Sequence, residues 1–530
     1  MRACGLFSTS VSRNGRVADI DDGSDALQRL RERLALTSDE TRTEALERRH
    51  AKAFRTAREN LHDLVDADSF QEYGQLAVAA QRNRRDYADL QSATAADGII
   101  TGTCTINADV VDRRRARAAV AINDYSVLAG TQGYFHHRKL DRLCDVAARY
   151  RLPVVMFTEG GGGRPGDTDV ATQIAGLNLS SFAAWARLSG RVPRIAVTNG
   201  YCFAGNAALF GCADFRIATQ QSWIGMAGPA MIEGGGLGSF APTDIGPAKE
   251  QQRNGVVDIL VADEAEATRL ARQLLSYFQG DVAQWDCADQ AELRSIIPVD
   301  RRWGYAVRKI IELLADAGSF LELQRVFGRG IVTGFIRIEG RPLALLASDC
   351  QQLGGAVDAE SADKAARFLN ICGALGLPVL SLVDTPGFMV GPDSERAGAV
   401  RRMSALFTAG AALTVPLVAI FLRKGYGLGA MAMTGGGFME PVYSAAWPNG
   451  EFGGMGLEGA VRLGYSKELA ATPAGEARDA LFAELVANLY EVGKATEAAA
   501  HLEIDAVIDP ADTRRAVLNA LDAAAVSAHA

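Results

Sequence analysis

The chain has 530 residues, more than one hydrophobic core usually supports, so two or more domains are expected. Hydrophobic residues make up 48% of the sequence and charged residues 22%, as in ordinary soluble globular proteins. The formal net charge of −8 argues against nucleic acid as a main partner. The 8 cysteines form no Cys-x-x-Cys pair, which argues against a zinc ribbon or a redox dithiol and favours reduced thiols in a cytoplasmic protein.

The two ends of the chain differ from its middle. Residues 1–23 are expected to form a disordered tail; the opening MRACGLFSTSVSRNGR has the arginines and serines of an organelle transit peptide but no clear amphipathic face. Residues 24–97 and the part after Gly464 are charged, with apolar residues at helical spacing. Both flanks are predicted to be packing and association helices.

Between these flanks the sequence repeats itself. Two segments, 119–130 and 151–162, return at 344–355 and 376–387 with a constant offset of 225 residues. The matched positions are Asp124 and Asp349, Lys139 and Lys364, Pro153 and Pro378, and Glu159 and Asp384. Further along, Val192-Pro193 matches Val415-Pro416 at an offset of 223.

Each copy predicts a strand, a glycine-bearing loop, an amphipathic helix and a second strand that ends in an acid and glycines. The helices are predicted over 136–150 and 359–375, and the second strands are the apolar runs PVVMF and PVLSLV. Strands that alternate with helices indicate right-handed β-α-β units. The sequence therefore predicts two homologous α/β domains, over residues 24–296 and 297–530.

Two segments invite other interpretations. The segment LVDTPGFMVG (382–391) resembles the switch of a GTPase, but the sequence contains no G-x-x-x-x-G-K-[ST] phosphate loop. We therefore predict that D-T-P-G is a strand-to-loop turn like EGGG at 159–162. The apolar run 406–422 approaches the length of a membrane span, but Val415-Pro416 divides it. We expect a helix end, a turn and a core strand there, and no membrane partner.

Two later stretches, 192–209 and 415–433, each predict a core strand, a glycine loop and a helix start. A helix start presents backbone N–H groups without intrahelical acceptors, and such groups stabilise a developing oxyanion. The groups concerned belong to Gly205 and Asn206 in the first copy and to Leu428 and Gly429 in the second. The alternative is a pair of tight turns that allow close packing of helix against strand.

Together these motifs resemble the carboxyltransferase (β) subunits of biotin-dependent acyl-CoA carboxylases, over about residues 30–520. The most specific matches are LPVLSLVDTPGFMVGPDSE, RKGYG and AAWPNGEFGGMGLEGAV, and DGIITG, EGGGGR and CFAGNAA extend them toward the N-terminus. The resemblance implies an α/β fold of two homologous crotonase-type (ClpP/crotonase) domains in tandem with flanking helices. It also implies an enzyme that moves the carboxyl group from carboxybiotin to the α-carbon of an acyl-CoA.

The resemblance further implies roles for particular residues. The amides of Gly205 and Asn206 would stabilise the thioester enolate, and those of Leu428 and Gly429 the biotin ureido anion. Acyl-CoA binding is expected at Gly161, Gly162, Gly163 and Arg164, and an influence on acyl chain length at Met431. A surface ion pair for Arg164 and core packing for Met431 are the alternatives. The loops F-A-G-N-A and Y-G-L-G-A depart from the family's usual C-A-G-G-A and Y-G-G-A, which indicates a divergent branch handling larger acyl groups.

The sequence contains no A-M-K-M biotin-attachment motif and no evident ATP-binding glycine loop of a biotin carboxylase. The resemblance therefore implies biotin on a partner carrier protein, a biotin carboxylase partner, no metal in this chain, and a homo-oligomer, hexamers included, whose active site spans two subunits. Two alternatives stay open: the carboxyltransferase component of a biotin-dependent acyl-CoA decarboxylase, and a non-catalytic scaffold subunit. A hydratase or isomerase fits less well, because it would need a carboxylate base.

Overall fold

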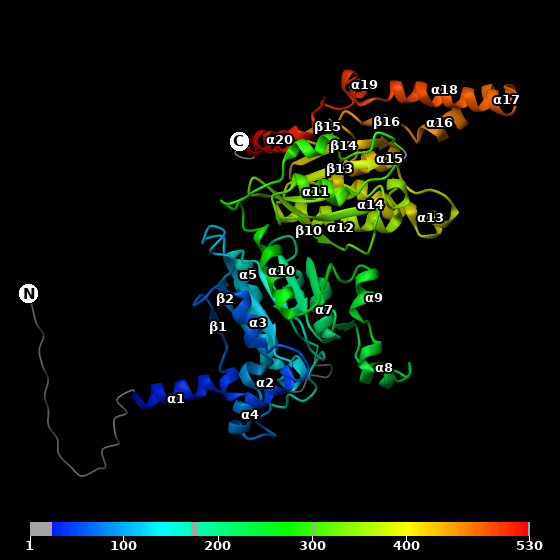
Figure 1. Cartoon of the computed structure of the whole chain (residues 1–530). Coiled ribbons are helices and arrows are strands. Elements are labelled where there is room, and N and C mark those ends of the chain that lie inside the picture. Colours follow the sequence, from blue (N-terminus) through cyan, green and yellow to red (C-terminus); the bar gives the residue numbers. More distant parts are fainter. Residues whose placement is uncertain (1–23, 171–176, 302, 528–530) are drawn as a thin grey trace, which may run out of the picture.

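The computed structural model describes residues 24–170, 177–301 and 303–527. The predicted tail, residues 1–23, lies outside the described residues. The described chain forms two α/β units, each built on its own sheet, with the N-terminal unit below the C-terminal unit in Figure 1. This arrangement confirms the predicted fold class of two similar α/β domains in tandem.

The sheet of the N-terminal unit has the strand order β1-β2-β3-β4-β5-β7-β9. Its first three strands are antiparallel, and the strands from β3 to β9 are parallel. The strands span Gln71–Tyr73 (β1), Ile99–Thr105 (β2), Arg117–Asn123 (β3), Val154–Phe157 (β4), Arg194–Thr198 (β5), Phe215–Thr219 (β7) and Ile259–Val261 (β9). Helices of this unit include Thr43–His50 (α2), Ala57–Leu64 (α3), Tyr87–Ala93 (α4), Tyr134–Tyr150 (α5), Ser181–Ala186 (α6), Ala248–Arg253 (α9) and Glu264–Ser276 (α10).

The sheet of the C-terminal unit has the order β10-β11-β12-β13-β14-β15-β17, and β16 pairs with the end of β14. Again the first three strands are antiparallel and the others parallel. The strands span Leu321–Leu323 (β10), Ile331–Ile338 (β11), Arg341–Ser348 (β12), Val379–Thr385 (β13), Leu417–Tyr426 (β14), Tyr443–Ala446 (β15), Glu451–Gly453 (β16) and Ala506–Val507 (β17). Its helices include Val307–Leu314 (α11), Ala359–Leu375 (α12), Pro392–Arg396 (α13), Ala399–Ala411 (α14), Ala495–Ala500 (α19) and Thr513–Ser527 (α20).

The repeat seen in the sequence extends to the strand register. Ala119 pairs with Val154 between β3 and β4, and Ala344 pairs with Val379 between β12 and β13, so both partners keep the offset of 225. Because a slip of one residue would turn every side chain to the other face of a sheet, equal register means that the two copies bury equivalent residues.

The two predicted helices are present, with one difference. The helix predicted over 359–375 coincides with α12. The helix predicted from residue 136 begins earlier, at Tyr134, because the carboxylate of Asp167 accepts a hydrogen bond from the Tyr134 N–H at 2.8 Å. This acid lies 33 residues away in sequence and satisfies an N–H group of the first turn that sequence reasoning leaves without a partner.

The matched lysines, Lys139 and Lys364, perform the same structural task in both units. Lys139 donates to the carbonyls of Ala96, at 2.9 Å, and of Ile99, the first residue of β2. Lys364 Nζ lies 2.7 Å from the carbonyl oxygen of Ile331, the first residue of β11. Burial lowers the pKa of Lys139 to about 8 and that of Lys364 to about 7. Each lysine therefore ties a helix to the start of a sheet strand.

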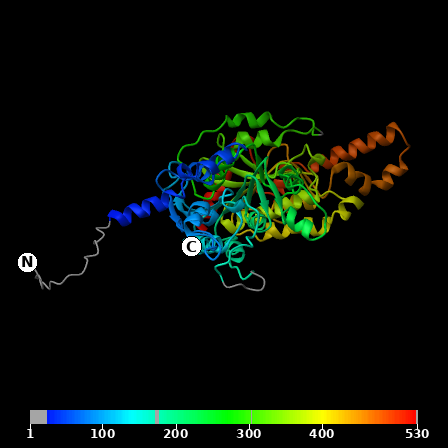
Figure 2. The same ribbon diagram turned by 90° about the horizontal axis from the view of Figure 1, so that it is seen from below.

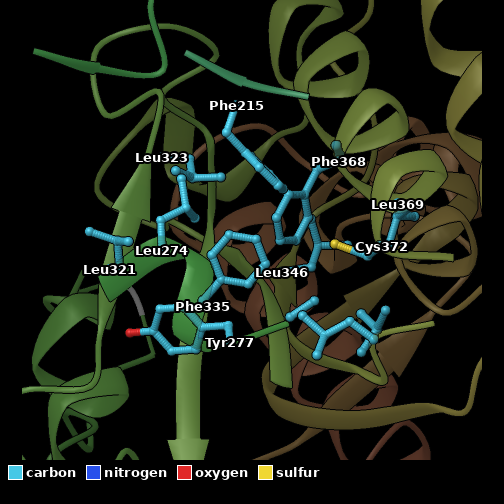
Figure 3. Close-up of a cluster of buried hydrophobic side chains, with 14 of the residues drawn as sticks. Phe215, Leu274, Tyr277, Leu321, Leu323, Phe335, Leu346, Phe368, Leu369 and Cys372 are labelled. Atoms are coloured by element: carbon cyan, nitrogen blue, oxygen red, sulfur yellow. The ribbon is translucent and has the colours of Figure 1, made fainter. Parts of the chain in front are cut away.

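One hydrophobic cluster joins the two units. The Phe335 ring of β11 stacks on Tyr277 with centroids 5.2 Å apart and meets Phe215 of β7 edge-on at 5.5 Å. Phe368 of α12 lies 5.5 Å from the same ring, and Figure 3 shows these four side chains within one buried group. Because aromatic residues of both units fill this cluster, burial of apolar surface holds the units against each other.

The segment that connects the two units packs toward the second one. Leu293 and Ile297, which flank the predicted division at 296/297, both belong to the hydrophobic cluster of the C-terminal sheet. Across the junction, Arg367 of α12 pairs with Asp258 at 3.2 Å. Charge pairing thus accompanies the apolar contact between the units.

The apolar run 406–422 is not a membrane span. It contains the end of α14, a turn at Val415-Pro416 and the first part of β14, as the sequence predicts. In the described ranges, no helix combines the length and the apolar character needed to cross a bilayer.

Two groups of helices extend away from the body. Figure 2 shows α1 (Ser24–Ala35) projecting on one side and the group α16 (Leu457–Gly464), α17 (Ser466–Ala471) and α18 (Glu476–Val492) on the other. None of the α18 residues is buried. Of these elements, α1, α17 and α18 lie in the predicted flanks, whereas α20 of the C-terminal flank packs into the core of the second unit.

Candidate active site

The first glycine loop lies where a short strand runs into a helix. β6 (Tyr201–Phe203) pairs in parallel with β8 (Trp223–Gly225), and α7 (Gly205–Cys212) begins two residues after β6 ends. Between them, Ala204 has φ 51° and ψ −119°, and its N–H donates to the Gly225 carbonyl at 3.0 Å. The backbone N–H groups of Gly205 and Asn206 then meet no acceptor among the described residues.

The second glycine loop has the same construction. β14 ends at Tyr426, its last residues pair with β16, and α15 (Gly427–Met433) follows at once. Gly427 has φ 58° and stands 223 residues after Ala204, which also has a positive φ. The N–H groups of Leu428 and Gly429 likewise find no acceptor within the part of the chain that the structure describes. Each unit therefore carries a free amide pair at this helix start, at the positions singled out from the sequence.

The Asn206 side chain links the first amide pair to the glycine-rich loop after β4. It is fully buried, and its Oδ1 accepts a hydrogen bond from the Gly162 N–H at 3.0 Å. The sequence predicts only a backbone role for Asn206 and misses this contact. A polar residue between the apolar residues of a buried helix start was the available signal, since a buried amide side chain needs a partner.

The glycine-rich loop and the D-T-P-G turn are built alike. In the first copy the Gln132 N–H donates to the Gly162 carbonyl at 2.7 Å, and in the second the Val357 N–H donates to the Gly387 carbonyl at 3.0 Å. Both pairs keep the offset of 225. The prediction that D-T-P-G is a strand-to-loop turn equivalent to EGGG is confirmed.

The second amide pair rests directly on this turn. A methyl group placed on Gly429 would lie 2.5 Å from the Gly387 carbonyl carbon and 2.8 Å from the Phe388 nitrogen. Only glycine therefore permits this approach of α15 to the D-T-P-G turn. Leu428, one residue earlier, is 60% exposed, so its N–H lies at an accessible part of the loop.

The remaining predicted residues lie around the first loop and on α15. The Arg164 guanidinium pairs with Asp97 and donates to the Thr131 carbonyl at 2.8 Å. Its side chain is only 5% exposed, so the ion pair that was the alternative interpretation is buried and not at the surface. Gly161 donates to the Ala129 carbonyl at 3.1 Å, and Met431 on α15 is half-buried. A methyl group added at Gly163 would meet no atom within 4 Å.

The acid at the end of each second strand is held by an arginine. Glu159 accepts two hydrogen bonds of 2.9 Å from Arg49 of α2, and Asp384 accepts one of 3.0 Å from Arg423 of β14. Burial raises the pKa of Glu159 to about 7 against the lowering effect of Arg49. Sequence reasoning finds both acids and misses both arginines, of which Arg49 stands 110 residues away. Both carboxylates therefore bind arginine side chains of the same unit.

Metal-ligating side chains do not cluster in the described part of the chain. No group of three or more histidine, cysteine, aspartate or glutamate side chains is arranged to hold a metal ion in residues 24–170, 177–301 and 303–527. What the described site offers is two pairs of backbone amides, each at a helix start beside a glycine turn. Such pairs stabilise negative charge on an oxygen atom.

Two tandem crotonase-like units are the fold of acyl-CoA carboxyltransferases. The model of the carboxyl transferase domain family matches residues 48–529, and the chain belongs to this family. It is therefore an enzyme of the type found as the carboxyltransferase β subunit of biotin-dependent acyl-CoA carboxylases.

Three relatives illustrate the match. The propionyl-CoA carboxylase β chain of Saccharopolyspora erythraea is 32% identical over 498 residues, which cover 90% of this chain and 89% of the relative. The crystal structure of transcarboxylase 12S, described as a hexamer assembly with methylmalonyl-coenzyme A bound, is 29% identical, covers 97% of both chains and has a TM-score of 0.81. A single-chain, multi-domain long-chain acyl-CoA carboxylase is 54% identical over 93% of this chain with a TM-score of 0.88. This chain spans 48% of that enzyme's length.

Proposed function

We propose that the N-terminal domain, residues 24–296, holds the acyl-CoA and that the C-terminal domain, residues 297–530, holds the biotin of a partner protein. The observation that carries this proposal is the duplicated amide pair: Gly205 and Asn206 in one unit, Leu428 and Gly429 in the other. A reaction with two anionic oxygens, one on each reactant, needs two such sites.

The first pair would act on the thioester. The Gly205 and Asn206 N–H groups donate to the thioester oxygen as negative charge develops there on loss of the α-proton. Asn206 Oδ1 fixes the Gly162 N–H, so the loop formed by Gly161, Gly162 and Gly163 keeps its place beside the pair. We assign the contact with the CoA moiety to this loop and to Arg164, whose guanidinium binds Asp97 and lies against Gly133.

The second pair would receive the biotin. Carboxybiotin supplies the carboxyl group when bound. The Leu428 and Gly429 N–H groups fit a ureido oxygen, because neither has an acceptor among the described residues and Leu428 lies at an exposed position. Because arginines hold Glu159 and Asp384, we assign neither acid the role of base. Biotin, when bound, would supply the acceptor for the α-proton after it has given up its carboxyl group, and the described residues would supply charge stabilisation and positioning.

A long-chain acyl-CoA is the proposed substrate. The support is the 54% identity to the long-chain acyl-CoA carboxylase, against 32% for the propionyl-CoA carboxylase relative. Met431, half-buried on α15 three residues after Leu428, is the residue that we assign to acyl chain length within the C-terminal unit. An apolar residue there suits an alkyl chain.

The chain is proposed to work in a larger assembly. The partner is a biotinylated carrier with a biotin carboxylase, and the chain itself forms a homo-oligomer, with the hexamer of transcarboxylase 12S as the leading form. A cytoplasmic location is supported by the cysteines, because the seven in the described residues are all free thiols.

The test is ATP-dependent fixation of 14C-bicarbonate by the purified chain, a carboxylated carrier and biotin carboxylase, over acyl-CoAs of two to sixteen carbons. Fixation that is fastest on the long chains is the expected result. Fixation on short chains alone would overturn the substrate proposal. Release of CO2 from a carboxylated acyl-CoA without fixation would assign the chain to a decarboxylase, and no turnover in either direction would leave the scaffold role.

A further inference from the structure

An unusual apolar surface lies beside the first amide pair. Four large apolar side chains between residues 226 and 240 are exposed: Met226 by 74%, Met231 by 68%, Leu237 by 75% and Phe240 by 48%. Single exposed apolar residues are common and need no explanation. Four within 15 residues, in a segment whose charged residue is Glu233 alone, make this segment both exposed and apolar, which suits contact with an apolar ligand.

This segment is joined to the amide pair by the backbone. In the parallel pair of β6 and β8, Phe203 is opposite Gly225, so Met226 stands at the register position of Ala204, directly before the Gly205 and Asn206 amides. The Ala204 N–H donates to the Gly225 carbonyl at 3.0 Å and fixes this position. The exposed apolar segment therefore begins beside Ala204, the residue that precedes the first amide pair.

The exposed segment continues into α8 (Pro229–Gly234), a helix at the outer edge of the N-terminal unit (Figure 1). A methyl group on Gly228 would lie 3.4 Å from the Phe203 ring, so the start of α8 packs on the strand that leads to the amides. No residue of α8 is buried. Met231 lies on this helix, farther from the amide pair along the chain than Met226.

We infer that Met226 and Met231 form the wall that receives the acyl chain beyond the α-carbon and that, together with Met431, they set the preference for long chains. This inference rests on the proposed function, which places the thioester at Gly205 and Asn206. An alkyl chain offers no hydrogen bond, so it requires a surface of this apolar kind. Methionine suits chains of different length, because its unbranched side chain adapts its shape.

The test uses Met226→Gln and Met231→Gln, singly and together, with Leu27→Gln as a matched control. Leu27 is 47% exposed on α1, outside the matched family region. For each Met variant we expect kcat/KM for dodecanoyl-CoA to fall about tenfold and that for propionyl-CoA to change by less than about twofold. Isothermal titration should give the same split in Kd without any catalytic turnover. Leu27→Gln should change neither.

Three results would overturn the inference: an equal loss on both substrates, no loss on either, or a change in assembly mass by light scattering in the Met variants. The last would mean that a second copy of the chain covers this surface. Failure of the proposed function looks different, because the unsubstituted chain would then show no preference for dodecanoyl-CoA over propionyl-CoA before any variant is made.

Discussion

The contact between α15 and the D-T-P-G turn yields a sharp prediction for the second amide pair. Substitution Gly429→Ala adds one methyl group, whose carbon would lie 2.5 Å from the Gly387 carbonyl carbon and 2.8 Å from both Gly387 Cα and the Phe388 nitrogen. All three neighbours are backbone atoms and cannot rotate away. Since ordinary contact begins near 3.4 Å, the start of α15 must move by about 0.9 Å.

This displacement is large compared with the tolerance of a hydrogen bond. An N–H···O distance of about 2.9 Å would lengthen to about 3.8 Å, beyond the range in which the amide stabilises an oxyanion. We therefore expect carboxyl transfer to slow by about 10²–10³-fold, the usual cost of one lost donor. Overpacking should also lower the free energy of unfolding by about 1–3 kcal/mol.

Leu428→Ala is the matched control. It keeps the backbone N–H and removes a side chain that is 60% exposed, so transfer should stay within about threefold of the unsubstituted chain. The assay is the initial rate of 14C fixation from pre-carboxylated carrier, with the Kd for acyl-CoA as a second readout. Because acyl-CoA is proposed to bind to the other unit, that Kd should not change. Equal rates for the two variants, or an unslowed Gly429→Ala with an unchanged melting temperature, would refute the reasoning.

Three further predictions concern stability and reactivity. Ala204→Gly should raise the free energy of unfolding in urea by about 1 kcal/mol, because φ 51° with ψ −119° is strained for alanine; an unchanged or lower value would contradict this. Asp384→Asn should lower the free energy of unfolding by about 3 kcal/mol, because Arg423 loses its buried partner. The control Asp393→Asn, at a side chain that is 94% exposed, should lower it by less than about 0.5 kcal/mol. Equal effects of the two substitutions would show that the pair of Asp384 and Arg423 does not stabilise the fold. Burial raises the pKa of Cys104, Cys144 and Cys202 to about 12, so these side chains stay protonated at about pH 8. Iodoacetamide at that pH should therefore label the exposed Cys212 before these three, which should react only on unfolding. Early labelling of any of the three would contradict this prediction.

The local elements were predictable because their signals are local. The helix of α12 follows from an Asp358 cap, helical spacing and a glycine stop at Gly376, all within the segment itself. The start of α5 was not predictable, because Asp167, which accepts the hydrogen bond from the Tyr134 N–H, comes from another loop. The same holds for Arg49, which reaches Glu159 from a helix in the flank where sequence reasoning found no chemistry.

The candidate site likewise has features that the sequence predicts and features that it does not. The positions of the two amide pairs follow from the repeat, because a duplicated glycine loop after a duplicated strand fixes the backbone whatever the side chains are. The contact of Asn206 with Gly162, the approach of Gly429 to Gly387 and the exposure of Met226 depend on which loops the fold places side by side.

The sequence by itself determined the duplication, the α/β class, the strand-to-loop turns and the two amide pairs. These properties rest on periodicity and turn chemistry, which act over a few residues. Only the tertiary structure decided that both units share one aromatic cluster, that arginines hold Glu159 and Asp384, and that an exposed apolar segment follows the strand paired with β6. Such contacts join residues tens to hundreds of positions apart, and packing selects them from many partners that the sequence allows.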